Sequence, residues 1–533
     1  MNIPANAKTQ TISGEKYVFI DTPYWNAEKH RGEHKRRYIG KIVEGQFVPN
    51  GRYLLSLEKS GTIKPGPVPV TECKRQFYGA TYLLDQIGDK LGIVDDLKAS
   101  FPDKYKQLLS LAYFFVLEEG MSAYRLRKWA LTHNHPYGRD IPSQRISELM
   151  GSIDEASKMN FFRRQARRRA EKEFLAFDTT SISSYSELIK FAKYGKNKEG
   201  DHLPQINLAL LYGEVSRLPV YFRKLTGNTA DVSLIRNLML DIDFLDMKKL
   251  SFVMDRGFYS EKNINDLMKH HHKFLIGIRC GLKIARKHLD EVRGEQLVSW
   301  ENYHDDVGLY AMSFSDEWDY REEHPRTGKC ICDKRRVYVH IYFNDQRCTD
   351  ERLSFAKYLT CLQDELKSGR KTEGHLKDYD KYFVVSETLK KGLHIIPNGD
   401  AIREHQRDFG YFVLLSNGIK DPEEAINLYR VRDLIEKAFA NLKERLDMRR
   451  MSVSSSENFE GKLFVQFLAL IYLSYIKKQM DEKGLYKKYT MQTLLDDLDI
   501  IELYQQPGRA HHLSEITKKQ IALYDAMGVP FPK

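Results

Sequence analysis

The sequence predicts a multidomain α/β protein in which a mixed sheet with flanking helices is interrupted by a mostly β insertion. Two short apolar runs, residues 174–177 and 251–254, each lead into an aspartate. Continuous apolar runs of this length are typical of strands buried on both faces. Segments with helical periodicity alternate with these strands, which is the pattern of an α/β fold. At 533 residues the chain is too long for one ordinary core, and such a length suggests roughly three or four domains.

Two regions are predicted before the sheet. Residues 1–60 form a small β-rich N-terminal region, because strand-like runs lie there around basic and Gly/Pro-rich turns. Residues 61–70 contain three prolines and are typical of a linker. From 75 to 172 apolar residues recur at helical spacing, and this helical region ends in an arginine-rich segment, residues 163–169. The helical region is either a helix-turn-helix module or a bundle that packs on the core.

The first part of the core is predicted over residues 173–280. It begins with the strand that leads into Asp178. Residues 205–212 and 218–225 are predicted as an antiparallel pair of strands. The strand that leads into Asp255 follows, and after it come a helix and a further strand.

The spacing of acidic residues places the insertion. Asp255 follows Asp178 by 77 positions, whereas Glu436 follows Asp255 by 181. A structureless loop of that length is improbable, and alternating apolar and polar residues in 337–343 predict a strand inside the interval. The domains predicted after the first part of the core are therefore a mostly β insertion, the second part of the core and a C-terminal helical region, at residues 281–408, 409–480 and 481–533.

A helix predicted from Asp421 onward carries four unlike residues along one line: Tyr429, Arg432, Glu436 and Lys443, here called the signature residues. At roughly 100° per residue they fall within an arc of about 60°. An apolar stripe beside this line fixes the carboxylate at the edge of a buried face, between two cations and a phenol. Taken alone, such a line is more typical of a solvated helix edge with incidental ion pairs. Beside other carboxylates it suits a metal ligand next to a phosphate backbone.

Those other carboxylates are Asp178 and Asp255. An acidic residue at the tip of a buried strand is desolvated, so it is usually ion-paired or a metal ligand. Two such aspartates and the helical Glu436 form a ligand set that holds two divalent cations about 3.5–4 Å apart for in-line phosphoryl displacement.

At this point the chain resembles the DDE transposases of prokaryotic insertion sequences, in the branch with a Tyr-x2-Arg-x3-Glu-x6-Lys signature. The four signature residues match that spacing without departure. Residues 255–258, Asp-Arg-Gly-Phe, match the second-aspartate motif Asp-x-Gly-Phe/Tyr. Residues 227–231 resemble the Gly-Asn-Thr-x-Asp turn of the family, and residues 178–181 are a looser match to its first-aspartate segment. The resemblance covers roughly residues 170–480.

The resemblance implies an RNase H-like catalytic core that cleaves DNA at transposon ends and joins the 3′-OH ends to target DNA. Asp178, Asp255 and Glu436 would be the catalytic residues and would hold two Mg²⁺ ions, with Mn²⁺ as a substitute. The other three signature residues would bind DNA. Arg432 and Lys443 would neutralise phosphates, and Tyr429 would stack on the DNA or hydrogen-bond to it. The helical region at 75–172 would then be the domain that binds the transposon ends.

The charge balance is compatible with a polyanionic partner. Lysine and arginine number 84 against 73 aspartates and glutamates, so the net charge is +11 and the pI is about 9.0. Each basic cluster alone is more typical of a solvated face, but together with 12% aromatic residues the clusters make nucleic acid the leading partner. The expected partners are double-stranded DNA, in the form of terminal inverted repeats and target DNA, and a second copy of the chain when DNA ends are bound. The basic clusters lie at residues 34–37, 163–169, 334–336 and 445–450.

Two rival functions remain. One is a nuclease of the same fold that cleaves DNA without joining it. The other is a non-catalytic DNA-binding protein derived from a transposase.

The remaining features predict a cytoplasmic, nucleoid-associated protein with no membrane partner. The N-terminus has no signal-peptide pattern, and the six cysteines show no paired framework. The longest apolar run, residues 463–476, is typical of a core or interface helix. Cys330 and Cys332, with His324, His340 and Cys348 near in sequence, do not have the spacing of a standard zinc site. Residues 270–272, three histidines, close a predicted helix, where cations favour the dipole, and this explanation is preferred to a metal site.

Overall fold

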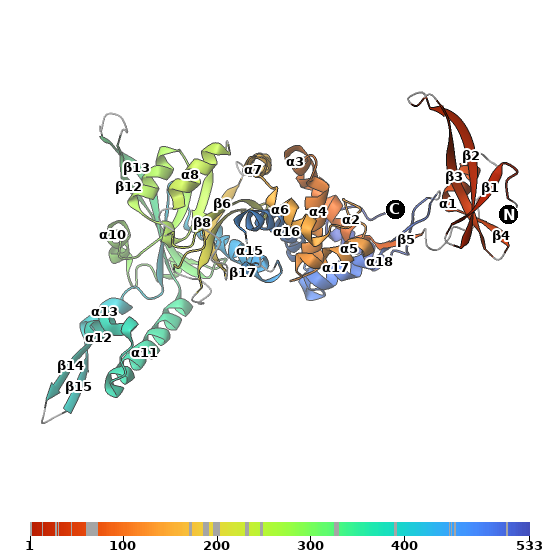
Figure 1. Ribbon diagram of the computed structural model, residues 1–533. Helices are drawn as coiled ribbons and strands as arrows, with labels where there is room; N and C mark the ends of the chain where they lie inside the picture. The colour runs from red at the N-terminus through yellow and green to blue at the C-terminus, as the bar shows by residue number, and fades with distance from the viewer. Residues whose placement is uncertain are drawn as a thin grey trace. The chain divides into compact units, whose positions relative to one another are not determined.

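The computed structural model forms two compact units, Met1–Gln76 with Ile501–Glu515 and Phe77–Ile500 with Ile516–Lys533. Figure 1 labels many of the elements of both units. The predicted linker 61–70 lies outside the described residues, as do Asp231 of the predicted turn and His324. The described residues are 3–12, 14–26, 29, 31–43, 45–59, 73–169, 173–184, 191–195, 203–229, 234–245, 249–323, 330–388, 392–446, 448, 450–451, 455–507 and 510–533.

The first unit is built on a four-stranded antiparallel sheet in the order β1-β2-β3-β4. Val18, Ile39 and Phe47 form its small core, against which helix α1 packs through Tyr53. A second, three-stranded sheet has the order β19-β18-β5. The elements are β1 Ala7–Ile12, β2 Glu15–Asn26, β3 Arg31–Val43, β4 Gln46–Pro49, α1 Gly51–Lys59, β5 Lys74–Phe77, β18 Glu502–Gln505 and β19 His512–Leu513.

The second unit contains a large mixed sheet, in agreement with the predicted α/β class. Its strand order is β11-β12-β13-β16-β10-β9-β6-β7-β8, and β17 pairs with the end of β6. β8, β7 and β6 form an antiparallel meander, whereas β9 runs parallel to β6 and β10 runs parallel to β9. The strands are β6 Phe174–Ser184, β7 Gln205–Gly213, β8 Pro219–Thr226, β9 Ser251–Met254, β10 Lys273–Ile278, β11 Tyr303–His304, β12 Leu309–Glu323, β13 Cys330–Phe343, β16 Tyr411–Ser416 and β17 Arg450–Met451.

The helices that follow the central strands begin where the sequence provides capping residues. The hydroxyl of Ser260 accepts a hydrogen bond from the Asn263 amide at the start of α9, and Asp421 caps α14 in the same way. Pro422 occupies the first turn of α14, where its missing N–H costs nothing. The helices near the sheet are α8 Leu234–Phe244, α9 Glu261–Lys269, α10 Lys283–Val292, α14 Pro422–Arg430 and α15 Arg432–Glu444.

A helical region surrounds one long helix, α16 Ser456–Glu482, which packs on α4 and α6. Among the described residues α16 alone is long and apolar enough by composition to cross a membrane, but 94% of its most apolar window is buried in this unit. The run at 463–476 is therefore part of a core helix, as predicted, although the helix is longer than the run. The other helices are α2 Gly79–Lys90, α3 Ile93–Ser100, α4 Tyr105–Leu117, α5 Leu126–Thr132, α6 Ser143–Gly151, α7 Glu155–Arg169, α17 Met491–Asp499 and α18 Lys518–Ala526.

The helical region packs directly on the sheet through aromatic side chains. The ring of Phe162 on α7 lies 5.2 Å from Phe222 of β8 and 5.4 Å from Phe467 of α16. This contact is what the bundle alternative for residues 75–172 requires. Whether the same region also binds DNA ends stays a prediction.

The interval 281–408 is mixed rather than mostly β. β12 and β13 extend the main sheet, while the part farther along the chain is mainly helical and has its own core around Phe355, Leu362 and Tyr382. The strand signal at 337–343 does not extend over the whole interval, because Phe355, Leu362 and Leu366 lie at helical spacing and form one buried face of a long helix. Its elements are α11 Asp345–Ser368, α12 Leu376–Tyr382, β14 Phe383–Thr388, β15 Gly392–Pro397 and α13 Gly399–Gln406.

Candidate active site

Asp178 and Asp255 follow paired positions on two neighbouring parallel strands. Phe177 of β6 is in register with Met254 of β9, and each aspartate is the residue that follows this pair along the chain. β9 ends at Met254, whereas β6 continues beyond Asp178 to Ser184. The prediction that both aspartates end their strands is therefore wrong for Asp178. The polar residues that follow Asp178 remain extended because they pair with β7.

Each aspartate is held by its local backbone. Asp178 is buried, with 8% of its surface exposed, and its Oδ1 accepts a hydrogen bond of 2.7 Å from the Thr179 amide. Asp255 precedes a single turn of 3₁₀-helix, Arg256–Phe258. The buried Phe258 ring lies 5.0 Å from the ring of Phe177 and so anchors this turn to β6.

The helix predicted over the signature residues is two helices, α14 and α15, with Val431 between them. The Val431 amide bonds to the Leu428 carbonyl and the Leu434 amide bonds to the Val431 carbonyl, which is the three-residue spacing of a tight 3₁₀ turn. The break could not be predicted, because there is no glycine or proline at this point of the sequence. Tyr429 consequently ends one helix and Arg432 begins the next.

Arg432 lies at the centre of a network of acidic and phenolic oxygens. Its Nη1 donates to Asp255 Oδ1 at 3.2 Å and to the Tyr429 hydroxyl at 3.0 Å. Its Nη2 donates to Glu436 Oε1 at 3.3 Å. The Tyr429 hydroxyl in turn donates to Asp255 Oδ1 at 3.3 Å. The guanidinium thus links the end of β9 to both helices that carry the signature residues.

Electrostatics explain why this arginine stays charged although its side chain is only 16% exposed. Burial lowers the pKa of Arg432, but the phenol of Tyr429 and the carboxylates of Asp255 and Asp178 raise it above its usual value. Burial also raises the pKa of Tyr429 to about 12, so the phenol is a neutral hydrogen-bond donor near pH 7. All three acidic residues of the predicted triad therefore contact Arg432 or act on it through space.

The predicted metal ligands surround Arg432 rather than meeting each other. Among the residues that the structure describes, no three His, Cys, Asp or Glu side chains lie close enough to hold one metal ion. The Glu436 side chain is 59% exposed. Lys443 lies in the last turn of α15, farther along the same helix, and is half-buried.

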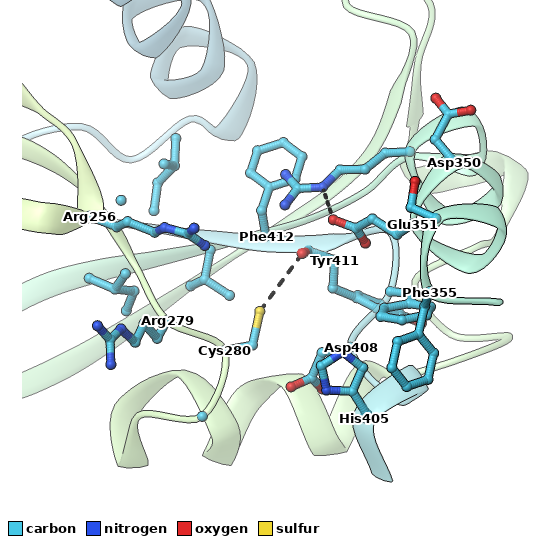
Figure 2. Close-up of a pocket in the computed structure, with 18 of the residues that line it drawn as sticks. Arg256, Arg279, Cys280, Asp350, Glu351, Phe355, His405, Asp408, Tyr411 and Phe412 are labelled. Carbon is cyan, nitrogen blue, oxygen red and sulfur yellow. Dashed lines mark hydrogen bonds and ion pairs between the residues drawn. The ribbon is translucent and has the colours of Figure 1, made fainter. Parts of the chain in front are cut away.

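A cavity of about 1350 Å³ opens beside Asp255 and extends to α11 and α13. Figure 2 shows Arg256 and Arg279 on one side of it and Phe355 and His405 on the other. The His405 ring lies 4.3 Å from the Phe355 ring, and burial lowers the pKa of this histidine. The cavity therefore has two arginines near Asp255, whereas its far side carries aromatic rings together with the carboxylates of Glu351 and Asp408.

Three residues that line the cavity, Arg256, Arg279 and Gly277, were not predicted from the sequence to belong to the site. Gly277 lies in β10, where a Cβ atom would stand 2.7 Å from the Tyr429 hydroxyl. One signal was available, because an isolated glycine inside a strand often marks the close approach of another group. The two arginines had no comparable signal, since neither belongs to a basic cluster.

The cysteines and histidines that were weighed as metal ligands, and not predicted to be so, form no cluster of three among the described residues. His340 is buried and contacts the Ser313 hydroxyl, and Cys348 is buried on α11. Cys330 and Cys332 are exposed, with their sulfurs 3.5 Å apart. Of the three consecutive histidines, His270 caps the end of α9 and His272 is buried, where its Nδ1 accepts a hydrogen bond from the Leu250 amide.

Comparison with protein families shows to which family this chain belongs. The family model described as "Transposase DDE domain" matches residues 169–472, which is more than half of the chain. The chain belongs to the DDE transposase family. The match includes β6, β9 and both helices of the signature residues, and it confirms the resemblance predicted from the sequence.

Two solved transposase structures are similar to this transposase at a distance. One is the cryo-EM structure of the piggyBac transposase synaptic complex with hairpin DNA, at 12% identity and a TM-score of 0.35 over 78% of this chain and 70% of that one. The other is the Mos1 transposase paired-end complex with the left transposon end, at 12% identity and a TM-score of 0.14 over 49% and 79%. No curated protein matches the chain.

Proposed function

We propose that this transposase cleaves DNA at the ends of an insertion sequence and joins the 3′-OH ends to target DNA by metal-dependent phosphoryl transfer. The observation that carries the proposal is the position of Arg432, whose guanidinium lies among acidic groups contributed by β6, the end of β9 and α15. Asp255 and Glu436 accept hydrogen bonds from Arg432, and Asp178 acts on it through space, so acidic groups from three elements converge where a cationic centre can be held. Membership of the DDE family supports the same assignment.

The strand order supports an RNase H-like assignment for the core. An antiparallel meander, β8-β7-β6, is followed in the sheet by two strands parallel to β6. In this arrangement, Asp178 belongs to the first strand of the core and Asp255 to the strand beside it. β12 and β13, with the helical part that follows them, would be the insertion into that core.

The donor set fits a hard divalent cation. Asp178, Asp255 and Glu436 offer only carboxylate oxygens, which are the ligands that Mg²⁺ and Mn²⁺ prefer. These three residues would hold the ions, which when bound supply an activated attacking oxygen and stabilise the leaving oxygen. In the proposed cycle Arg432 leaves the carboxylates when the ions bind.

Released from the carboxylates, Arg432 would contact a phosphate of the DNA strand, and Lys443 another phosphate farther along. Tyr429, a neutral phenol at the edge of the cavity, would hydrogen-bond to or stack on the same strand. The arginines of the cavity would neutralise the strand end that enters it. Because two transposon ends must be held together for joining, we expect a dimer of this chain on DNA.

The test is a cleavage and joining assay on DNA that carries the ends of the element. Asp178→Asn, Asp255→Asn and Glu436→Gln should each abolish nicking and joining in Mg²⁺, while binding of the ends is nearly retained. Asp433→Asn, on the exposed side of α15, is the matched control and should remain active. If any triad variant keeps appreciable nicking, the assignment of that ligand is wrong.

The same assay separates the two rival functions. A nuclease would nick the ends but would not join pre-nicked ends to a target plasmid. A non-catalytic DNA-binding protein would do neither, with any divalent ion.

A further inference from the structure

The β2–β3 hairpin of the first unit extends beyond the sheet core that supports it. The small core around Val18 and Ile39 lies at the base of the hairpin. Beyond it, residues 20–26 pair with residues 31–37, and most of these side chains are exposed. This segment is here called the outer ribbon. A two-stranded ribbon without an apolar face is marginally stable by itself in water, so its length and exposure indicate a binding partner.

The outer ribbon is strongly basic along one strand. The β3 strand of the ribbon, residues 31–37, contains four lysines and arginines and one glutamate. The cationic side chains alternate between the two faces, since Lys35 and Arg37 lie on one face and Arg36 on the other. Arg36 donates to the Gln10 side chain and lies over the Phe19 ring, 5.1 Å from its centre, so it is directed at the sheet.

Lys35 and Arg37 differ from Arg36 in their contacts. Both are exposed, and neither forms an ion pair with any residue that the structure describes. They are two positions apart on the same face, about 7 Å along the strand. The one acidic residue of β3, Glu33, bonds to Arg31 at 2.9 Å and to the Tyr24 hydroxyl at 2.9 Å. The ribbon therefore offers two cations at a regular spacing to an anionic partner.

Aromatic side chains are exposed on the same ribbon. Trp25 is 67% exposed and Tyr24 is 46% exposed. They are neighbours in sequence and therefore lie on different faces of the ribbon. Trp25 pairs across the ribbon with Gly32, and Tyr24 pairs with Glu33. Trp25 lies on the face of Arg36 and Tyr24 on the face of Lys35 and Arg37, so each face of the ribbon carries an aromatic ring and a cation. Cations together with exposed aromatic rings fit a nucleic acid better than an acidic protein.

We propose that the outer ribbon is a separate DNA-binding element of this chain and that it lies in the major groove of double-stranded DNA. The major groove is about 12 Å wide and admits a two-stranded β-ribbon, whereas the minor groove is about 6 Å wide. Lys35 and Arg37 contact phosphates at the groove wall, and Trp25 makes an apolar contact near the end of the ribbon. The inference rests on the proposed function only for the identity of the partner, and it concerns a unit that contains none of the signature residues.

The first test measures duplex binding by fluorescence anisotropy across a salt series. The full-length chain carries Glu436→Gln so that the DNA is not consumed, and the probe is a labelled duplex of mixed sequence of about 30 base pairs, roughly three helical turns. Lys35→Ala with Arg37→Ala should weaken binding by about tenfold or more near 0.1 M salt and lower the salt slope by roughly 1 to 2. Lys357→Ala with Lys367→Ala removes the same charge from exposed positions of α11 and should change neither value.

A second test reports on the contact without depending on loss of binding. Addition of the duplex should quench part of the tryptophan fluorescence, and Trp25→Phe should remove that part. Dimethyl sulfate protection of guanine N7, which faces the major groove, should appear with the unsubstituted chain and disappear with the Lys35/Arg37 variant. Circular dichroism of each variant checks that the sheet is folded.

Several outcomes overturn the inference. One is an unchanged affinity and salt slope in the Lys35/Arg37 variant. Another is equal competition by a single strand or by double-stranded RNA of the same length, which would exclude the major groove. A change of oligomeric state in light scattering without any change in DNA binding would assign the ribbon to a protein interface.

If the chain binds through the ribbon but neither cleaves nor joins DNA, the proposed function fails while this inference stands.

Discussion

The guanidinium of Arg432 binds the carboxylate of Asp255, with Nη1 and Oδ1 3.2 Å apart, across 177 positions of the sequence. The family resemblance assigns Arg432 to a DNA phosphate and Asp255 to a metal ion. Because the two side chains contact each other, Asp255 cannot bind a metal ion through this oxygen while Arg432 occupies it, and Arg432 cannot bind DNA while it is held by Asp255. In the proposed cycle, Arg432 would leave Asp255 and Glu436 so that these carboxylates could hold a divalent cation.

Replacing Arg432 should therefore strengthen divalent-ion binding while it weakens DNA processing. Arg432→Met keeps most of the side-chain volume and removes the positive charge, so the apparent affinity for Ca²⁺ should rise on the order of tenfold. Isothermal titration without DNA measures it. Lys437→Met, on the exposed side of α15, is the control and should leave the affinity unchanged. Unchanged or weaker Ca²⁺ binding in Arg432→Met would show that the guanidinium does not occupy the ion site.

Gly277→Ala should disturb the site through Tyr429. The added Cβ would stand 2.7 Å from the Tyr429 hydroxyl and 3.3 Å from the Arg256 amide nitrogen, so the phenol must move away from Asp255. We expect cleavage to slow about tenfold, with little change in stability, because the obstructed atom is at the end of a side chain. Gly281→Ala has nothing within 4 Å of its Cβ and is the control.

A double variant identifies the cause of that defect. Tyr429→Phe removes the hydroxyl that the new methyl group meets, so Gly277→Ala with Tyr429→Phe should cleave as fast as Tyr429→Phe alone. If the double variant is slower than Tyr429→Phe by the full Gly277→Ala factor, the methyl group acts on β10 or Arg256 and not through Tyr429.

Asp85 should make stability depend on pH. Burial raises the pKa of this carboxyl on α2 to about 6, although the Tyr113 hydroxyl donates to it at 2.7 Å. The folded chain holds the proton more tightly than the unfolded chain, whose aspartate has a pKa near 3.8. Stability is therefore lost as the pH rises from about 4 through 6. Asp85→Asn should gain about 1–3 kcal/mol at pH 8 and almost nothing at pH 4.

Urea unfolding at the two pH values measures this difference. Asp364→Asn, an exposed aspartate of α11, is the control at both. A gain of equal size at pH 4 and pH 8 would mean that the substitution acts through packing and not through ionisation.

Glu460 should anchor the helical region to the sheet. Its carboxylate on α16 accepts from Lys158 of α7 at 2.8 Å and also pairs with Lys224 of β8. Burial raises its pKa, but the two lysines lower it below the usual value of 4.5. Because the folded pKa is depressed, this contribution is present above pH 4.5 and is lost as the pH falls through the folded value.

Glu460→Ala should destabilise the chain by about 2–4 kcal/mol at pH 7, since the buried Lys158 loses one of its two carboxylate partners. Thermal unfolding at pH 7 and at pH 3.5 checks it, and the effect should shrink at the lower pH. Glu457→Ala, exposed on the same helix, should cost little. A loss that does not depend on pH would contradict the ion-pair explanation.

Local sequence signals were sufficient for the central strands and for where their helices begin. The apolar runs before Asp178 and Asp255 predict buried strands because such strands need apolar residues on both faces. Asp421 and Pro422 predict the start of α14 because the first amides of a helix need an acceptor. These features depend only on residues close in sequence, and for this reason they could be predicted without knowledge of the tertiary structure.

Two features could not be predicted from local signals. They are the break at Val431 and the mixed α/β character of residues 281–408. No residue near Val431 forbids a continuous helix, and the turn forms where α14 packs on the sheet and α15 packs on α16. β12 and β13 have the alternating pattern of any half-buried pair, so their membership of the main sheet depends on pairing with the distant β16.

The sequence by itself determined the family, the spacing of the signature residues and the central α/β pattern, because each is carried by residue identity and local periodicity. Only the tertiary structure decided what Arg432 contacts. The spacing of Tyr429, Arg432 and Glu436 places them along one line of a helix, but it says nothing about which surface meets that line. The packing of α14 and α15 against the sheet brings Asp255 within hydrogen-bond distance of Arg432, and at that distance a buried guanidinium is more stable beside a carboxylate than alone.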